Sequence, residues 1–180
     1  LFQDPTTPTP EGPPGFHGKV AYTSGPLYLS ATFINQKHEG ITDAADFDAF
    51  GFDLGGKYTA GPAEFMAYYY TGEGIGTTGL FLLGDNGAGA ERDSDGFIAQ
   101  ATYTVGKTKF GLNYGESNLD AVAGDSALLV SKNSKFTLGA YHKLTDNLTL
   151  VGEFTSLASE NQIGGENEAN TINVGAFMAF

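Results

Sequence analysis

The polar groups that could do chemistry in this sequence recur within segments that alternate between apolar and polar residues. On a β-strand, alternate side chains share one face, so these groups are expected to lie together on one polar face. Charges gathered on a wetted face bias which mobile ions pass it, although some of them could instead pair across strands as structure. The set comprises Lys19, Asp53, Lys57, Glu64, Lys109, Asn113, Lys135, Lys143 and Glu153.

Other chemistries find little support in the sequence. Gly74, Gly76 and Gly79 match a dinucleotide-binding fingerprint, but the glycines that follow disfavour the helix which that motif needs. The three histidines have no metal-ligand spacing, and no serine lies in a nucleophile elbow. The sequence therefore predicts no enzyme, no cofactor and no metal centre.

Most carboxylates lie between the alternating segments rather than within them. We interpret them first as the ordinary solvated chemistry of loops. The alternative is bridging of Ca²⁺ or Mg²⁺, because carboxylates are the ligands that hard cations prefer. Glu91, Asp93 and Asp95 are the best candidates for such a site, although their spacing is not that of an EF-hand.

Length and composition limit the class of protein. The 180 residues suffice for one domain or one membrane barrel. The formal net charge of -12 disfavours a nucleic-acid partner, whose recognition needs a basic footprint. The chain has no cysteine, and it has no apolar run approaching the ~18 residues of a membrane helix, although β-strands can cross a membrane without one.

Residues 1–14 are rich in proline and are predicted to be a loop or linker, and residues 15–180 are predicted to be transmembrane β-barrel strands. The connections between strands alternate between short and long, which is the rhythm of an up-and-down antiparallel barrel. The expected strands are Phe16–Thr23, Leu27–Asn35, Asp48–Thr59, Ala63–Thr71, Gly96–Val105, Thr108–Glu116, Lys135–Leu144, Leu148–Ser156 and Asn170–Phe180.

The apolar face of these strands is expected to contact lipid. Its aromatic residues gather near the strand ends, as they do where rings sit at both membrane interfaces, and the opposite face carries few charges for a solvated surface. A soluble, lipocalin-like binder with its apolar face inward is the alternative. The expected aromatic girdle comprises Tyr58, Tyr69, Phe97, Tyr103, Phe110, Tyr114, Phe136, Phe154 and Phe180.

Nine strands cannot close an up-and-down barrel, which needs an even number. We therefore expect the chain to be the C-terminal part of a larger barrel, which fits the lack of a secretory signal at its start. An alternative uses only Leu27–Phe180 as a small eight-stranded barrel, which would act as an anchor or adhesin and leave Phe16–Thr23 without a role.

Several phrases of the sequence resemble the later strands of Gram-negative general porins. They are GKVAYTSGPLYLSATF, FDAFGFDLGGKYTAGPAEFMAYYYTGEG, DGFIAQATYTVGKTKFGLNYGES and the ending NVGAFMAF. The resemblance implies a sixteen-stranded trimeric barrel in the outer membrane, through which small hydrophilic solutes and ions diffuse passively. This chain would supply its last nine strands, with short turns periplasmic and long loops external.

The resemblance also implies partners: outer-membrane lipid and lipopolysaccharide, two further copies of the chain, and the barrel-assembly machinery, which reads a terminal Phe such as Phe180. The family's inward-folded loop, which narrows the pore, cannot be assigned to any residue of this sequence. The usual row of pore-wall arginines is also absent, because Arg92 is the only arginine and lies in a loop. The mixed signs of the polar face suggest mild ion selectivity.

Overall fold

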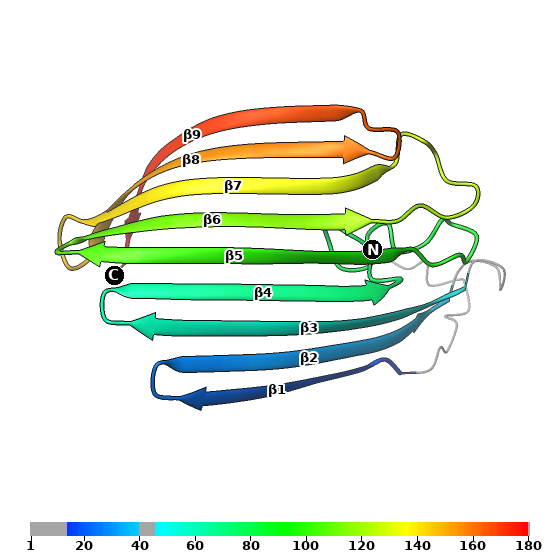
Figure 1. Cartoon of the computed structure of the whole chain (residues 1–180), viewed down its shortest axis with the longest axis horizontal. Coiled ribbons are helices and arrows are strands. Elements are labelled where there is room, and N and C mark those ends of the chain that lie inside the picture. The colour runs from blue at the N-terminus through cyan, green and yellow to red at the C-terminus, as the bar shows by residue number, and fades with distance from the viewer. Residues whose placement is uncertain (1–13, 40–45, 180) are drawn as a thin grey trace, which may run out of the picture.

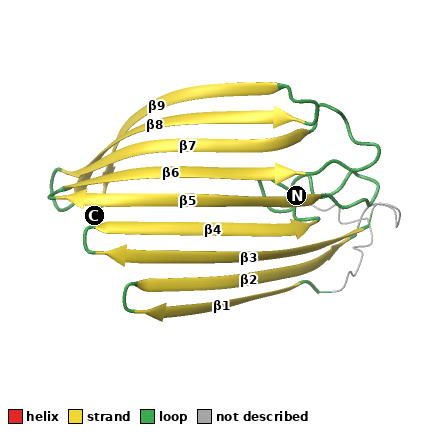
Figure 2. Ribbon diagram, in the orientation of Figure 1, coloured by secondary structure: helices red, strands yellow, loops and turns green. Residues whose placement is uncertain are grey.

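The structure, a computed structural model, describes residues 14–39 and 46–179, and over these residues it consists of nine strands with turns and loops between them (Figure 2). Residues 1–13 of the predicted linker and the terminal Phe180 lie outside the described residues. The strands are β1 (Phe16–Ser24), β2 (Leu27–His38), β3 (Phe47–Ala60), β4 (Ala63–Glu73), β5 (Asp93–Val105), β6 (Thr108–Leu119), β7 (Val130–Lys143), β8 (Leu148–Asn161) and β9 (Glu166–Met178).

All nine strands form one antiparallel sheet in chain order, as predicted (Figure 1). The sheet is curved but open, because among the described residues β9 contacts neither β1 nor β2. β1 pairs with β2 over all nine of its residues, so it is an integral strand. The structure therefore does not show the small barrel that β2 and β9 would have to close.

Short turns join the strands at one end of the sheet, and the β4–β5 and β6–β7 connections at the other end are longer (Figure 1). The predicted alternation fails at the last connection, because β8 and β9 continue their ladder until residues 162–165 alone join them, a turn as short as that between β7 and β8. Two-residue hairpin loops need a positive φ at the first position, which favours glycine. Gly25 and Gly61 occupy that position, with φ values of 54° and 60°. Because consecutive strands are antiparallel, the longer connections between β4 and β5 and between β6 and β7 lie together at the opposite end.

The strands run further toward the long connections than the hydropathy pattern predicts. β5 begins at Asp93 rather than Gly96, and β7 begins at Val130 rather than Lys135. Alternation in hydropathy reports only the part of a strand that faces two different media. The backbone hydrogen-bond ladder needs no apolar side chain and continues beyond that part.

Cross-strand register sorts the side chains onto two faces, because residues directly opposite each other point to the same side of a sheet. Phe33 lies opposite Phe52 on one face, and the neighbouring Thr32 lies opposite Asp53 on the other. Following such pairs from β1 to β9 gives one largely apolar face and one largely polar face.

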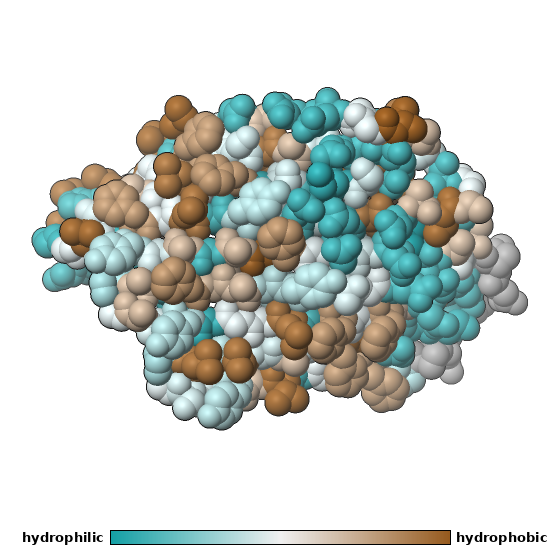
Figure 3. Space-filling model, viewed as in Figure 1, coloured by the Kyte–Doolittle hydropathy of each residue, from teal (hydrophilic) through white to brown (hydrophobic). Residues whose placement is uncertain are grey.

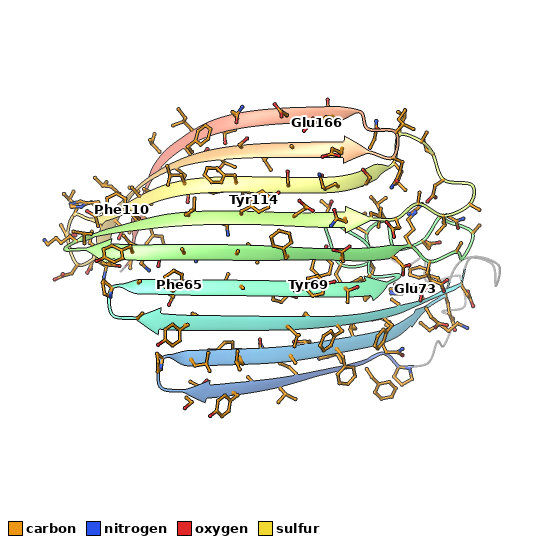
Figure 4. All side chains as sticks on the ribbon, viewed as in Figure 1. Phe65, Tyr69, Glu73, Phe110, Tyr114 and Glu166 are labelled. Carbon is orange, nitrogen blue, oxygen red and sulfur yellow. The ribbon has the colours of Figure 1, made fainter. Side chains whose placement is uncertain are left out.

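The polar face is concave. The connection between β4 and β5 lies against it, where Ile75 covers Gly51 of β3 and Thr77 contacts Ser117 of β6. One loop can touch strands so far apart on a single face only where the sheet curves around it. The apolar face is therefore convex, and Figure 4 labels Phe65 and Phe110 on that outer side.

The convex face leaves large hydrophobic side chains uncovered across its middle. Phe65 is 52% exposed, Phe110 is 49% exposed and Leu138 is 52% exposed. Figure 3 shows apolar residues spread over several strands of this face. An apolar surface of this extent marks contact with a membrane or a protein partner. These side chains do not converge into a dry interior, so the lipocalin-like arrangement is not adopted.

Over the described residues there is no helix with the length and hydropathy needed to cross a membrane.

Candidate functional site

The concave face carries all nine polar side chains that the sequence placed together. Their register partners show this directly: Lys19 lies opposite Thr32, which lies opposite Asp53. Asn113, further around the sheet, lies opposite Thr137 of β7. The same alternation along each strand brings Lys57, Glu64, Lys109, Lys135, Lys143 and Glu153 to this face.

Two of the predicted carboxylates have close partners on this face. The Lys57 ammonium lies 3.3 Å from the Glu64 carboxylate, and both side chains are partly exposed. The Tyr141 hydroxyl donates a hydrogen bond to Glu153, with an oxygen–oxygen distance of 2.5 Å. Both carboxylates are therefore partly neutralised or occupied by neighbours on their own face.

Two hollows indent the wall below the long connections. One, of about 350 Å³, lies over β1–β4 and is lined by Lys19, Asp53 and Lys57, so it carries both signs of charge. The other, of about 590 Å³, lies over β5–β8, and its lining includes Lys109 and Lys143. The structure thus places six of the nine predicted residues in two separate hollows of one wall, whereas Glu64, Lys135 and Glu153 line neither.

Lys107 also lines the second hollow, although the sequence pattern assigned it to the turn between β5 and β6. Its backbone oxygen accepts a hydrogen bond from the Lys143 amide at 2.9 Å, so the turn continues the ladder. Reading the pattern of alternation through the turn would have placed Lys107 on the face of Lys109, two residues away.

The β4–β5 connection folds onto the concave face at the end of the sheet that carries the long connections, although the sequence predicted only an external loop there. Ile75 and Thr77 are buried, with 7% and 3% of their surfaces exposed. Thr77 hydrogen-bonds Ser117 of β6 at 2.9 Å, and the ring of Phe81 meets His38 of β2 at a centroid distance of 4.3 Å. In Figure 1 part of this connection passes behind β5 and β6.

Close backbone approach explains two glycines at this contact. A Cβ on Gly72 would lie 2.8 Å from Ile75 Cδ1 and only 2.3 Å from the Phe50 carbonyl oxygen. A Cβ on Gly51 would lie 3.0 Å from Ile75 Cγ2. The apolar Ile75 and the Phe81–Leu83 run inside a glycine-rich loop were the sequence signals that this segment packs against protein.

Arg92 fixes the end of the same connection. Its guanidinium makes a two-point ion pair with Asp125 in the β6–β7 connection, at 2.8 Å from Nε and 2.5 Å from Nη2. It also donates to the carbonyl oxygens of Leu83, at 3.0 Å, and of Asp85. Both charged side chains are buried, with 7% and 4% of their surfaces exposed.

The ion pair shifts the titration of both groups. The hydrogen bond from Arg92, helped by a second from the Val122 amide, lowers the pKa of Asp125 from 3.8 to about 2 against the opposing effect of burial. The hydrogen bond to Asp125 likewise raises the pKa of Arg92. Both partners of this ion pair therefore remain charged at neutral pH and in acid down to the lowered pKa of Asp125.

The candidate cation site is not assembled in the structure. The Glu91 carboxylate accepts a hydrogen bond from the Asp48 amide at 2.9 Å, and Asp95 accepts one from the Asn118 side chain at 3.2 Å. Within residues 14–39 and 46–179, no three His, Cys, Asp or Glu side chains are grouped so that they could hold a metal ion.

The curved sheet, with lipid-compatible residues outside and charged residues inside, has a counterpart among known families. The profile of the Gram-negative porins matches residues 5–162. The chain belongs to this family. Membership places this porin chain in the outer membrane of a Gram-negative bacterium, and a porin's fold is that of a channel.

Solved porin structures match the fold at low sequence identity. The outer membrane channel DcaP of Acinetobacter baumannii is 16% identical, with 93% of this porin chain and 51% of that chain covered and a TM-score of 0.81. The anion-selective porin from Comamonas acidovorans is 21% identical, with coverages of 92% and 49% and a TM-score of 0.69. The trimer form of OmpT from Vibrio cholerae is 20% identical, with coverages of 88% and 52% and a TM-score of 0.58.

This porin chain spans about half the length of the solved porins it matches. No curated protein sequence matches it.

Proposed function

We propose that this porin chain forms about half of the wall of a water-filled outer-membrane channel, through which small hydrophilic solutes and ions diffuse passively. The observation that carries the proposal is the division of one curved sheet into an apolar convex face and a charged concave face. Lipid is the solvent that favours the first face, and water favours the second. The nine concave-face residues named above would line the passage.

The open edges of the sheet support a larger barrel. β1 and β9 each have one paired edge among the described residues, and an unpaired edge is not tolerated in hydrocarbon. The matched porins are about twice as long as this chain, which leaves length for the further strands that such a closure needs. The barrel would therefore be completed by further strands.

The convex face supports contact with lipid through its aromatic residues and through the change to charged residues at one end of the strands. The eight described residues of the expected girdle all lie on this face, and the rings of Phe97 and Tyr114 are 5.8 Å apart. In Figure 4 the aromatic side chains of β4 give way to Glu73 at the end with the long connections, and Glu166 lies near the same end of β9. That change supports a boundary at this level between acyl chains and lipopolysaccharide head groups.

Assembly partners complete the proposal. A homotrimer is supported by the trimer form of OmpT, whose fold this chain shares. Recognition of Phe180 by the barrel-assembly machinery is expected from the aromatic ending of the sequence, and this residue lies outside the described ones.

The inward-folded β4–β5 connection would narrow the outer end of the passage. It crosses the concave face from His38 on β2 to Ser117 on β6, and its inner residues line a hollow with Asp53, Tyr68 and Tyr70. A solute entering from outside would pass this segment before it reached the charged wall.

Conductance across planar lipid bilayers tests the proposed function. The complete native polypeptide, purified in detergent and added to one side, should produce stepwise, ohmic current increments in potassium chloride. The same preparation denatured by boiling should produce none. Folded polypeptide that inserts into vesicles but never raises the conductance would overturn the proposal.

A further inference from the structure

Three lysines meet at the periplasmic end of the wall, in the hollow over β5–β8. Lys109 lies directly opposite Tyr141, so it is the diagonal neighbour of Lys143. Lys107 continues the same ladder opposite Lys143, since Thr108 pairs with His142 and the Lys143 amide bonds the Lys107 carbonyl oxygen at 2.9 Å. Cross-strand neighbours at these positions are roughly 5 to 8 Å apart at their Cβ atoms.

This arrangement is unfavourable as structure alone. Like charges directly opposite each other on neighbouring strands destabilise a sheet, and here a third ammonium adds to the pair. None of the four ion pairs found among the described residues includes Lys107, Lys109 or Lys143. The cluster also stands out in a chain whose formal net charge is -12.

The rest of the lining provides neutral donors and no carboxylate. It includes the side chains of Gln100, Asn113, Thr104, Thr137 and Thr149. Two carboxylates of the concave face, Glu153 and Glu64, lie outside this lining and have other partners, because Glu153 accepts a hydrogen bond from the Tyr141 hydroxyl and Glu64 pairs with Lys57. Asp146, in the turn between β7 and β8, does not line the hollow.

Gly139 makes room for the Tyr141 side chain, which binds Glu153. A Cβ there would lie 2.7 Å from the Tyr141 hydroxyl oxygen, so the Tyr141 ring can fold over Gly139 only because it has no side chain. In that position the Tyr141 hydroxyl donates a hydrogen bond to Glu153 at 2.5 Å, and Glu153 does not line the hollow. The hollow thus keeps its positive charge uncompensated.

We propose that this hollow is a binding site for small polyvalent oxyanions, of which inorganic phosphate is the simplest. Three flexible ammonium groups surrounded by amide and hydroxyl donors match an anion with several oxygen acceptors, and charge-assisted hydrogen bonds of this kind are the strong ones. A singly charged, spherical chloride ion would use fewer of these donors. The inference rests on the proposed channel, and it replaces the mild selectivity expected from the mixed charges of the whole face.

Phosphate inhibition of the chloride current tests the site. Single channels of the complete native polypeptide are recorded in potassium chloride at neutral pH while potassium phosphate is titrated at constant ionic strength. We expect phosphate to lower the chloride conductance saturably in the wild type. The triple variant Lys107→Gln, Lys109→Gln, Lys143→Gln should raise the half-inhibiting phosphate concentration at least about tenfold, because its charge-assisted hydrogen bonds are lost.

Lys132→Gln is the matched control, because Lys132 lies on the convex side of β7 in an ion pair with Glu160 at 2.7 Å. It should leave phosphate inhibition unchanged. If the triple variant forms no channels, the single variants Lys109→Gln and Lys143→Gln decide, and each should weaken inhibition severalfold.

The outcomes separate the site from the channel. Absence of any channel from the wild type contradicts the proposed function. Channels that phosphate does not inhibit, or inhibits equally in the wild type and the lysine variants, overturn the oxyanion site and leave the channel standing.

Discussion

Removing the Arg92 guanidinium should release the β4–β5 connection from the concave face without unfolding the sheet. Arg92→Ala leaves Asp125 buried, with 4% of its surface exposed, and without its ionic partner. Leaving one charge of a buried pair unpaired costs about 3–5 kcal/mol. The carbonyl oxygens of Leu83 and Asp85 also lose their donor.

For the milder substitution Asp125→Asn, the loss of stability can be calculated from the shifted pKa of Asp125. A pKa lowered from 3.8 to about 2 corresponds to about 2 kcal/mol of stabilisation at neutral pH. This free energy belongs to closure of the connection, because the strands on either side are held by their own ladders. The opening equilibrium should therefore rise about 30-fold in Asp125→Asn and more in Arg92→Ala.

Hydrogen exchange measured by mass spectrometry reads this opening directly. The reporting amides are Arg92, bonded to Gly84 O at 2.8 Å, and Thr77, bonded to Leu82 O at 3.0 Å. Peptides that cover these amides should exchange about 30-fold faster in Asp125→Asn, whereas peptides from the middle of β6 and β7 should be unchanged.

The exposed pair of Lys132 and Glu160 gives the matched control. Its atoms are 2.7 Å apart and each side chain is 34% exposed. Such a surface pair contributes about 0–1 kcal/mol, so Glu160→Gln should change exchange in neighbouring peptides less than about fivefold. Equal protection of the β4–β5 connection in wild type, Arg92→Ala and Asp125→Asn would refute the reasoning.

Three further predictions follow from the same structure. The stabilisation from Asp125 is present above its ordinary pKa of 3.8 and is lost as pH falls toward about 2, so protection factors of the β4–β5 amides should drop between these pH values while those of mid-strand amides stay constant. Leu112→Lys on the convex face should destabilise the barrel in lipid vesicles by about 2–4 kcal/mol in urea titrations, whereas Asn113→Lys on the concave face should cost less than about 1 kcal/mol; equal effects would mean that the faces are assigned wrongly. Gly72→Val should displace the β4–β5 connection, because its Cβ would lie 2.8 Å from Ile75 Cδ1, and should therefore raise exchange there as Arg92→Ala does; because the same Cβ would lie 2.3 Å from the Phe50 carbonyl oxygen, exchange in the adjoining part of β3 should rise as well.

Much of the fold was readable in the sequence because lipid and water impose a two-residue period on a strand that separates them. That period predicted all nine strands and their order of pairing, and it gathered Asp53, Lys57 and the other polar residues on one face. It failed at the strand ends next to the long connections, where β7 begins five residues before the predicted Lys135. Where both faces of a strand contact water, its residues need not alternate in hydropathy, so the pattern does not reveal the backbone hydrogen-bond ladder.

The sequence by itself determined the elements and their faces, because side-chain alternation is a local property of the backbone. Only the tertiary structure decided which residues of different strands meet. The Arg92–Asp125 ion pair joins groups 33 residues apart, and the β4–β5 connection turns inward because Ile75 can approach Gly51 and Gly72 closely. The clustering of Lys107 with Lys109 and Lys143 likewise depends on the register of β6 against β7, which cannot be inferred from the sequence of either strand alone. Curvature and register are properties of the whole sheet, and they bring charges from separate strands together in the hollows of the concave face.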